Sequence, residues 1–151
     1  MSQHNKTLPA VLITGCSSGA GRAAALHYLK AGYPTFATAR RLASIQDLKN
    51  AGCETLELDV TKQNTIEQAV KAIEQKHGSV GILVNNAAIG IMTPIETIPI
   101  DEVRRQYETN IFGLLAVTQA VIPAMRKAGK GRIVNMGSSG GEFTTPGGGV
   151  Y

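Results

Sequence analysis

Five short apolar runs of strand length alternate with helix-length segments along this chain, and this alternation restricts the fold more than any other feature. The runs that we interpret as strands cover residues 10–14, 35–38, 55–58, 80–84 and 132–136. Most are apolar at consecutive positions, which is typical of parallel strands covered on both faces. Right-handed crossovers between such strands predict an α/β fold, a doubly wound parallel sheet in a three-layer αβα arrangement.

The intervening segments carry helical patterns over residues 22–30, 42–50, 63–77 and 101–125. In the third of these, Ile66, Ala69, Val70 and Ile73 form one apolar stripe, as expected for a helix that packs on a sheet. We expect the fourth helix to break near residues 110–113 and to bend at Pro123. Residues 89–99 and the glycine-rich residues 137–151 are predicted loops.

The length of 151 residues suits one domain, which we place at residues 8–151 behind a polar head of residues 1–7. The 15 basic and 11 acidic residues are scattered, so neither a nucleic-acid partner nor a membrane surface is predicted. The longest nearly apolar stretch is too short and too polar for a membrane span. Cys16 and Cys53 lack metal-ligand spacing, and we expect no metal and a cytoplasmic location.

A glycine-rich turn follows the first predicted strand and opens the first helix. Without a Cβ, glycines permit a tight turn and let backbone N–H groups approach a phosphate at the positive end of a helix. The spacing T-G-x-x-x-G-x-G therefore predicts a pyrophosphate site, although a turn with an ordinary packing role is the alternative. The candidate residues are Thr14, Gly15, Ser17, Ser18, Gly19, Ala20 and Gly21.

Two arginines follow the second strand, where a chain that prefers NAD carries an acid for the ribose 2′-hydroxyl. Arg40 and Arg41 stand there, and the next acid is Asp47. A guanidinium can bind a 2′-phosphate through two charge-assisted hydrogen bonds. We predict NADP(H) rather than NAD(H), with Arg40 the stronger candidate and Arg41 the second. The alternative is that both arginines only begin a surface helix.

Four motifs in order resemble the classical short-chain dehydrogenase/reductase family. They are the turn Thr14–Gly21, Leu58-Asp59-Val60, Asn85-Asn86-Ala87-Ala88, and the stretch from Ile133 to Ser139 with Tyr151 beyond it. The resemblance covers residues 8–151 and is to the N-terminal part of the family's domain. It implies a Rossmann-like domain and an NAD(P)-dependent oxidoreductase of alcohols and ketones. Within the family, the chain resembles most the branch of hydroxysteroid, retinol and lipid-ketone reductases.

The resemblance also assigns residues beside the cofactor. Asp59 and Val60 match the segment that reaches the adenine, although Asp59 is equally suited to a turn before Thr61. Asn86, Ala87 and Ala88 match the Asn-Asn-Ala-Gly segment, with Ala88 standing where the family has glycine. Asn85 belongs to the same segment, which in the family stabilises the sheet and lies beside the cofactor.

The resemblance implies three catalytic residues. Tyr151 matches the tyrosine that moves the proton, Ser138 the serine that orients the substrate oxygen, and Asn110 the asparagine of a water relay. Ser139 is the rival of Ser138. The family's lysine four residues after the tyrosine, which favours the phenolate of that tyrosine, has no counterpart among the 151 residues.

Two hypotheses follow for the function. The first is an oxidoreductase that transfers a hydride between NADP(H) and an alcohol or ketone, with an apolar substrate. The second is a non-catalytic, truncated nucleotide-binding fragment that lacks the lysine. The family's sheet has further strands, so we expect the fifth strand to be an unpaired apolar edge. The family's oligomers form through the helix at residues 101–127, which predicts a homo-oligomer for a full-length protein.

Overall fold

Five parallel strands form one sheet in the order β3-β2-β1-β4-β5 in the computed structural model, which describes residues 8–143 and 146–151. Residues 1–7, the predicted polar head, lie outside the described residues. The strands are β1 (Val11–Ile13), β2 (Thr35–Ala39), β3 (Glu54–Glu57), β4 (Ile82–Asn85) and β5 (Arg132–Asn135). The central strand β1 pairs with β2 on one side and β4 on the other. The predicted doubly wound sheet is confirmed.

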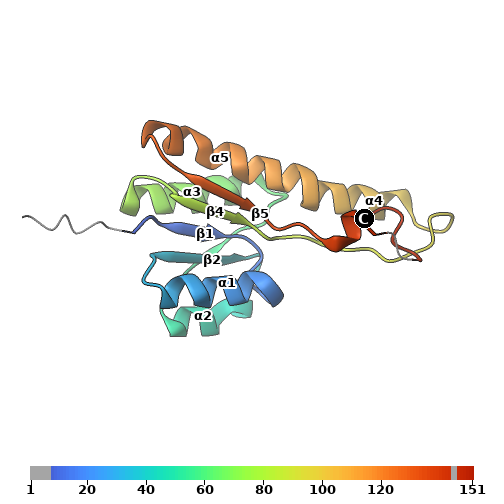
Figure 1. Cartoon of the computed structure of the whole chain (residues 1–151), viewed down its shortest axis with the longest axis horizontal. Coiled ribbons are helices and arrows are strands. Elements are labelled where there is room, and N and C mark those ends of the chain that lie inside the picture. The colour runs from blue at the N-terminus through green and yellow to red at the C-terminus, as the bar shows by residue number, and fades with distance from the viewer. Residues whose placement is uncertain (1–7, 144–145) are drawn as a thin grey trace, which may run out of the picture.

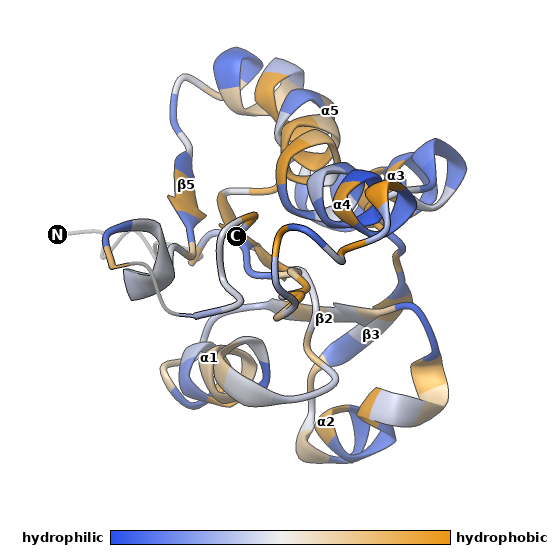
Figure 2. Ribbon diagram, turned by 90° about the vertical axis from the view of Figure 1, so that its right-hand side faces the viewer, coloured by the Kyte–Doolittle hydropathy of each residue, from blue (hydrophilic) through white to orange (hydrophobic). Residues whose placement is uncertain are grey.

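Helices cover both faces of this sheet, with α1 and α2 on one side and α3 and α5 on the other (Figure 1). The view along the sheet in Figure 2 separates the same two layers. The helical segments are α1 (Gly19–Lys30), η1 (Leu42–Ile45), α2 (Gln46–Ala51), α3 (Gln63–His77), α4 (Ile100–Tyr107), η2 (Glu108–Gly113), α5 (Leu114–Lys127) and η3 (Ser139–Gly141).

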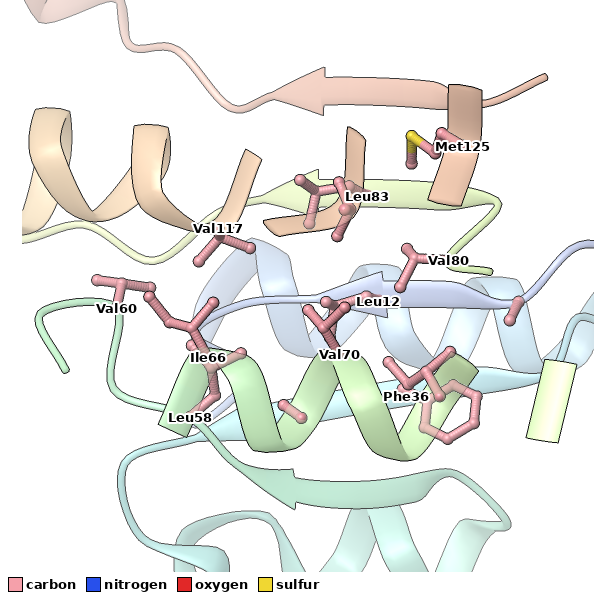
Figure 3. Packing of buried hydrophobic residues seen from close by; sticks show 14 residues of the cluster. Leu12, Phe36, Leu58, Val60, Ile66, Val70, Val80, Leu83, Val117 and Met125 are labelled. Atoms are coloured by element: carbon pink, nitrogen blue, oxygen red, sulfur yellow. The ribbon is translucent and has the colours of Figure 1, made fainter. Parts of the chain in front are cut away.

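Alternating residues of β1 build two separate cores, because successive side chains on a strand point to opposite faces. Leu12 faces α3 and α5 and packs with Phe36 and Val70, and Figure 3 shows these side chains gathered between α3 and the sheet. Val11 and Ile13 face α1 and α2. All three β1 residues are fully buried, so this strand is the centre of both cores.

The fifth strand differs from the others in its exposure. Among the described residues β5 pairs only with β4, and three of its four residues are exposed, with Val134 intermediate. Ile133 is 37% exposed, and Met136 just beyond the strand is 47% exposed. The predicted apolar edge is therefore present in the structure.

Three predictions about the helices were wrong, namely one start, one helix type and one break. The first helix begins at Gly19, three residues earlier than predicted, because the end of the glycine turn is itself helical. The predicted helix at residues 42–50 is a 3₁₀ turn followed by the short helix α2. The predicted break near residues 110–113 is a π-helical segment, η2, which keeps the chain helical between α4 and α5.

Candidate cofactor and catalytic site

The candidate site lies at the carboxyl ends of the parallel strands. The sheet order reverses between β1 and β4, because the chain builds outward to β3 and then returns to β4 on the other side of β1. Loops that leave such neighbouring strands in opposite directions open a crevice, and ligands of doubly wound sheets bind there. The glycine turn follows β1 and the Asn86 segment follows β4, so the fold brings these two predicted motifs together.

Hydrogen bonds join these two motifs directly. The Thr14 hydroxyl accepts hydrogen bonds from the backbone N–H groups of Asn86 and Ala87, both at 3.0 Å. The Asn86 amide nitrogen donates to the carbonyl oxygens of Thr14 and Gly15 at 2.9 and 3.0 Å. Thr14 and Asn86 therefore fix the relative position of the two loops.

Two glycines of the turn are required by this close approach. A Cβ on Gly21 would lie 2.2 Å from the amide nitrogen of Asn86, and one on Gly15 would lie 2.7 Å from the Cα of Ala87. Gly15 also has a φ of 71°, which L side chains rarely adopt. Gly15 and Gly21 thus serve loop-to-loop packing.

The first turn of α1 has the features of an anion site. Its N-cap residue Ser18 makes no side-chain capping bond, and the turn carries no acidic residue. The first N–H groups of a helix lack partners within the helix and lie at its positive end. A Cβ on Gly19 would meet nothing within 4 Å, so there is open space at this end of the helix. The residues present fit a phosphate group.

A cavity of about 440 Å³ extends from Gly15, Ser17 and Ser18 across the ends of β2, β3 and β4. Most of the predicted cofactor residues line it: Gly15, Ser17, Ser18, Arg40, Asp59, Val60, Asn86, Ala87 and Ala88. The others lie outside its lining: Thr14, Gly19, Ala20, Gly21 and Arg41. The lining thus comes from the ends of several strands.

The two arginines after β2 separate in the structure. Arg40 lines the cavity, whereas Arg41 is the N-cap residue of η1. The Arg41 carbonyl oxygen accepts from the Ser44 backbone N–H and hydroxyl at 3.0 and 2.6 Å. Of these two arginines, only Arg40 lines the cavity.

Asp59 makes the predicted turn before Thr61 and also lines the cavity. Its Oδ1 accepts from the backbone N–H of Thr61 at 3.0 Å and from the Thr61 hydroxyl at 2.8 Å, which closes a local turn. The same residue lines the cavity between Leu58 and Val60. The turn and the cavity role are compatible in this geometry.

The side chain of Asn85, on β4, bonds to α5 and to the edge strand β5. Its amide nitrogen donates to the Thr118 hydroxyl on α5 at 3.0 Å and to the Asn135 side-chain oxygen on β5 at 2.9 Å. Its own Oδ1 is buried without a hydrogen-bond partner among the described residues. Asn85 thus joins β4, α5 and β5.

The three predicted catalytic residues surround a second cavity of about 240 Å³, which Asn110, Ser138 and Tyr151 all line. The ring of Tyr151 also lines a third cavity of about 450 Å³, together with Ser138, Met92 and Phe143. The Ser138 hydroxyl accepts from the backbone N–H of Gly140 at 3.0 Å and caps η3. The fold therefore brings Ser138 and Tyr151, 13 residues apart, to the same two cavities.

Asn110 is fully engaged with the backbone of a neighbouring loop. Its Nδ2 donates to the Ile89 carbonyl oxygen at 2.8 Å, and its Oδ1 accepts from the Ile89 N–H at 2.9 Å. Both functional atoms of the side chain are used in this pair of bonds. The π-helical turn η2 carries Asn110 at the point where it meets this loop.

Sequence reasoning missed five residues of α4 and η2 at the site, among them Tyr107 and Ile111 in the lining of the second cavity. Arg105 and Thr109 line the cofactor cavity, and Gln106 lines the catalytic cavity with only 2% of its surface exposed. The spacing of Gln106 one helical turn before Asn110 was the available signal.

Cys16, inside the glycine turn, is fully buried and donates from Sγ to the Ile13 carbonyl oxygen at 3.3 Å. Burial raises the pKa of this thiol to about 12, against a smaller lowering by the backbone hydrogen bond with Thr38. The thiol is therefore a packing group of the turn.

Within residues 8–143 and 146–151, no cluster of three or more His, Cys, Asp or Glu side chains could hold a metal ion. None of the helices in the described part of the chain has the length and apolar character needed to cross a membrane.

Comparisons with known proteins agree with this geometry. The family model described as short chain dehydrogenase matches residues 9–151. The chain is 37% identical to the 3-ketodihydrosphingosine reductase of Bacteroides thetaiotaomicron, over 93% of this chain and 51% of that protein. It is 33% identical to the NADP-dependent 3-hydroxy acid dehydrogenase YdfG of Escherichia coli O6:H1, over 93% and 58%.

A solved structure gives the same result. The closed form of a serine dehydrogenase complexed with NADP+ superposes with a TM-score of 0.88 at 32% identity, covering 94% of this chain and 59% of that one. The chain thus spans a little over half the length of the relatives that it matches. The fold, the joined glycine and asparagine loops, and the match over residues 9–151 lead to one conclusion: the chain belongs to the short-chain dehydrogenase family.

Proposed function

We propose that this protein binds NADP(H) in the cavity at the strand ends and reduces or oxidises an apolar ketone or alcohol. The observation that carries the proposal is that Ser17 and the N-cap residue Ser18, at the uncapped N-terminus of α1, line the same cavity as Arg40. The first feature suits a pyrophosphate and the second suits a 2′-phosphate. Two similar proteins support the same cofactor: one is named as an NADP-dependent dehydrogenase, and the other was solved in complex with NADP+.

A bound nicotinamide cofactor would supply or accept the hydride. The chain's own residues then have the task of moving a proton to or from the substrate oxygen, because an alkoxide needs an acid within hydrogen-bond reach. The phenol of Tyr151 and the hydroxyl of Ser138 line the same two cavities and are our candidates for proton transfer and for orienting that oxygen. Asn110 holds the Ile89 loop beside them.

The substrate class rests on the third cavity. Met92 and Phe143 are 63% and 69% exposed and line it together with Ser138 and Tyr151. Large apolar side chains that remain exposed at the mouth of a polar site favour an apolar ligand. The similarity to a protein named as a reductase of a lipid ketone supports this choice.

Binding of the two nicotinamide cofactors tests the proposal. Arg40→Ala removes the guanidinium from the cavity, and we expect the dissociation constant for NADPH to rise about tenfold to a hundredfold, the loss of a charge-assisted pair. NADH binding should change by less than about threefold, since it has no 2′-phosphate. Calorimetric titration of both cofactors measures this difference.

Arg41→Ala is the matched control, because it removes the same group one residue further on and outside the cavity lining. Tighter binding of NADH than of NADPH by the unmodified protein, or equal losses in both variants, would contradict the assignment. Turnover of an apolar ketone with NADPH separates the enzyme from the alternative, a nucleotide-binding protein without catalysis, which predicts the same binding and no turnover.

We further propose that the complete protein forms a homo-oligomer through α4, η2 and α5. Ile111, Phe112 and Leu115 are 47%, 56% and 47% exposed along this continuous helical stretch. Exposed large apolar side chains at neighbouring positions are typical of a surface that packs against another chain.

A further inference from the structure

The buried amide of Gln106 connects the loop after β4 to the backbone beside Tyr151. Its Oε1 accepts from the Ile91 N–H at 2.9 Å, and its Nε2 donates to the Val150 carbonyl oxygen at 2.6 Å. Val150 directly precedes Tyr151. One side chain on α4 therefore bonds at the same time to two loops that are far apart in the sequence.

Gln106 and Asn110 act on the same loop. They are one helical turn apart, and residues with this spacing lie on one face of a helix. Asn110 bonds both backbone groups of Ile89, and Gln106 bonds the N–H of Ile91. The loop is thus held at alternate residues, with Gly90 between the two points.

Gly90 in turn lies against the ring of Tyr151. A Cβ on Gly90 would be 3.6 Å from Cε2 of that ring, and a Cβ on Gly140 would be 2.9 Å from its Cδ1. Backbone of these two glycines therefore lies near two edges of the ring, while 45% of the Tyr151 surface stays exposed. The loop and the backbone at Val150 both depend on Gln106.

We propose that Gln106 is a positioning residue for Tyr151. Only 2% of its surface is exposed, so its polar atoms were removed from water and need the two bonds that they make. Glutamine is suited to this place because its amide carries one acceptor and donors at its tip. A carboxylate can still accept from Ile91 but cannot donate to Val150. This inference rests on the proposed function, in which Tyr151 moves the proton.

Three variants separate the two bonds. Gln106→Met keeps a side chain of similar length and removes both bonds, and Gln106→Glu keeps the acceptor and loses the donor. Gln119→Met, at an exposed position on α5, makes the same chemical change away from the site. Circular dichroism shows whether each variant is folded. Should Gln106→Met fail to fold, the test is read from Gln106→Glu alone.

NMR of the whole chain reads the position of the tyrosine directly. The rings of the four tyrosines are labelled with ¹³C, and the Tyr151 signal is assigned by its loss in Tyr151→Phe. We expect this signal to move toward the shift of a free tyrosine in both Gln106 variants and to stay in place in Gln119→Met. Exchange of the Ile91 amide should accelerate about five- to tenfold in Gln106→Met, the effect of one hydrogen bond, and remain slow in Gln106→Glu.

Turnover of 2-decanone with NADPH supplies the catalytic test. We expect kcat to fall tenfold or more in both Gln106 variants, while the KM for NADPH changes by less than twofold, because Gln106 is not in the lining of the cofactor cavity. An unmoved Tyr151 signal, or an unchanged kcat in a protein that turns over, would overturn the role of Gln106. If the unmodified protein shows no turnover, the proposed function fails, and the Tyr151 signal still decides whether Gln106 holds the tyrosine.

Discussion

The central strand β1 and the edge strand β5 both carry branched apolar residues, but their surroundings are very different. Val11, Leu12 and Ile13 are fully buried between two layers of helices, whereas on β5 only Val134 is partly buried. The candidate site divides in the same way. Its cofactor side is built mainly from loops that follow the buried strands β1, β2 and β4, and Ser138 and Tyr151 follow the exposed strand β5. The comparison teaches that the cofactor side is stabilised by the core, while the catalytic side depends on a few tethering bonds.

The largest expected effect is on the free energy of unfolding, which should fall much more for a substitution in β1 than for one in β5. Leu12→Ala deletes buried atoms between β1 and α3, and we expect a loss of about 2–5 kcal/mol in the free energy of unfolding. Ile133→Ala on β5 should cost under about 1 kcal/mol, because this side chain is already partly in water. Urea denaturation followed by circular dichroism measures both values. Similar losses in the two variants would mean that β5 is covered as well as β1.

A smaller effect is expected where the glycine turn meets Asn86. Gly21→Ala places a Cβ 2.2 Å from the Asn86 amide, so the two loops must move apart, at about 1–3 kcal/mol. NADPH affinity should fall with stability, since both loops border the cavity. Gly137→Ala, just after β5, meets nothing within 4 Å and should change stability by less than about 0.5 kcal/mol. An equal loss of stability in the two variants would show that the close approach of Gly21 to Asn86 does not determine the cost of the added methyl group.

Local patterns in the sequence predicted most of the cofactor side. The apolar runs predicted the strands, and the glycine spacing after β1 predicted the turn, because both signals lie within a few consecutive residues. The packing of one loop against the other could not be predicted from local patterns. Nothing near Gly21 in the sequence indicated that Asn86 would require it to be small. The two loops meet only in the folded sheet, where Thr14 bonds to Asn86, 72 residues further along the chain.

The catalytic side depended on resemblance rather than on local pattern. Ser138 and Tyr151 stand in glycine-rich loops without a helical or strand period, and only their interval singled them out. Gln106 was not predicted as a site residue because its hydrogen-bond partners, Ile91 and Val150, are 15 and 44 residues away in two irregular segments. A polar residue on a helix gives no sign in the sequence that both ends of its amide will be buried.

An NMR titration of the uniformly ¹⁵N-labelled chain with NADPH tests the central claim most directly, namely that the covered strands carry a formed cofactor site. We expect amide shifts at the glycine turn, Arg40, the Asp59 turn and residues 86–89, with β5 largely unchanged. Shifts concentrated on β5 and its flanking loops, or no saturable shifts at millimolar NADPH, would contradict the account.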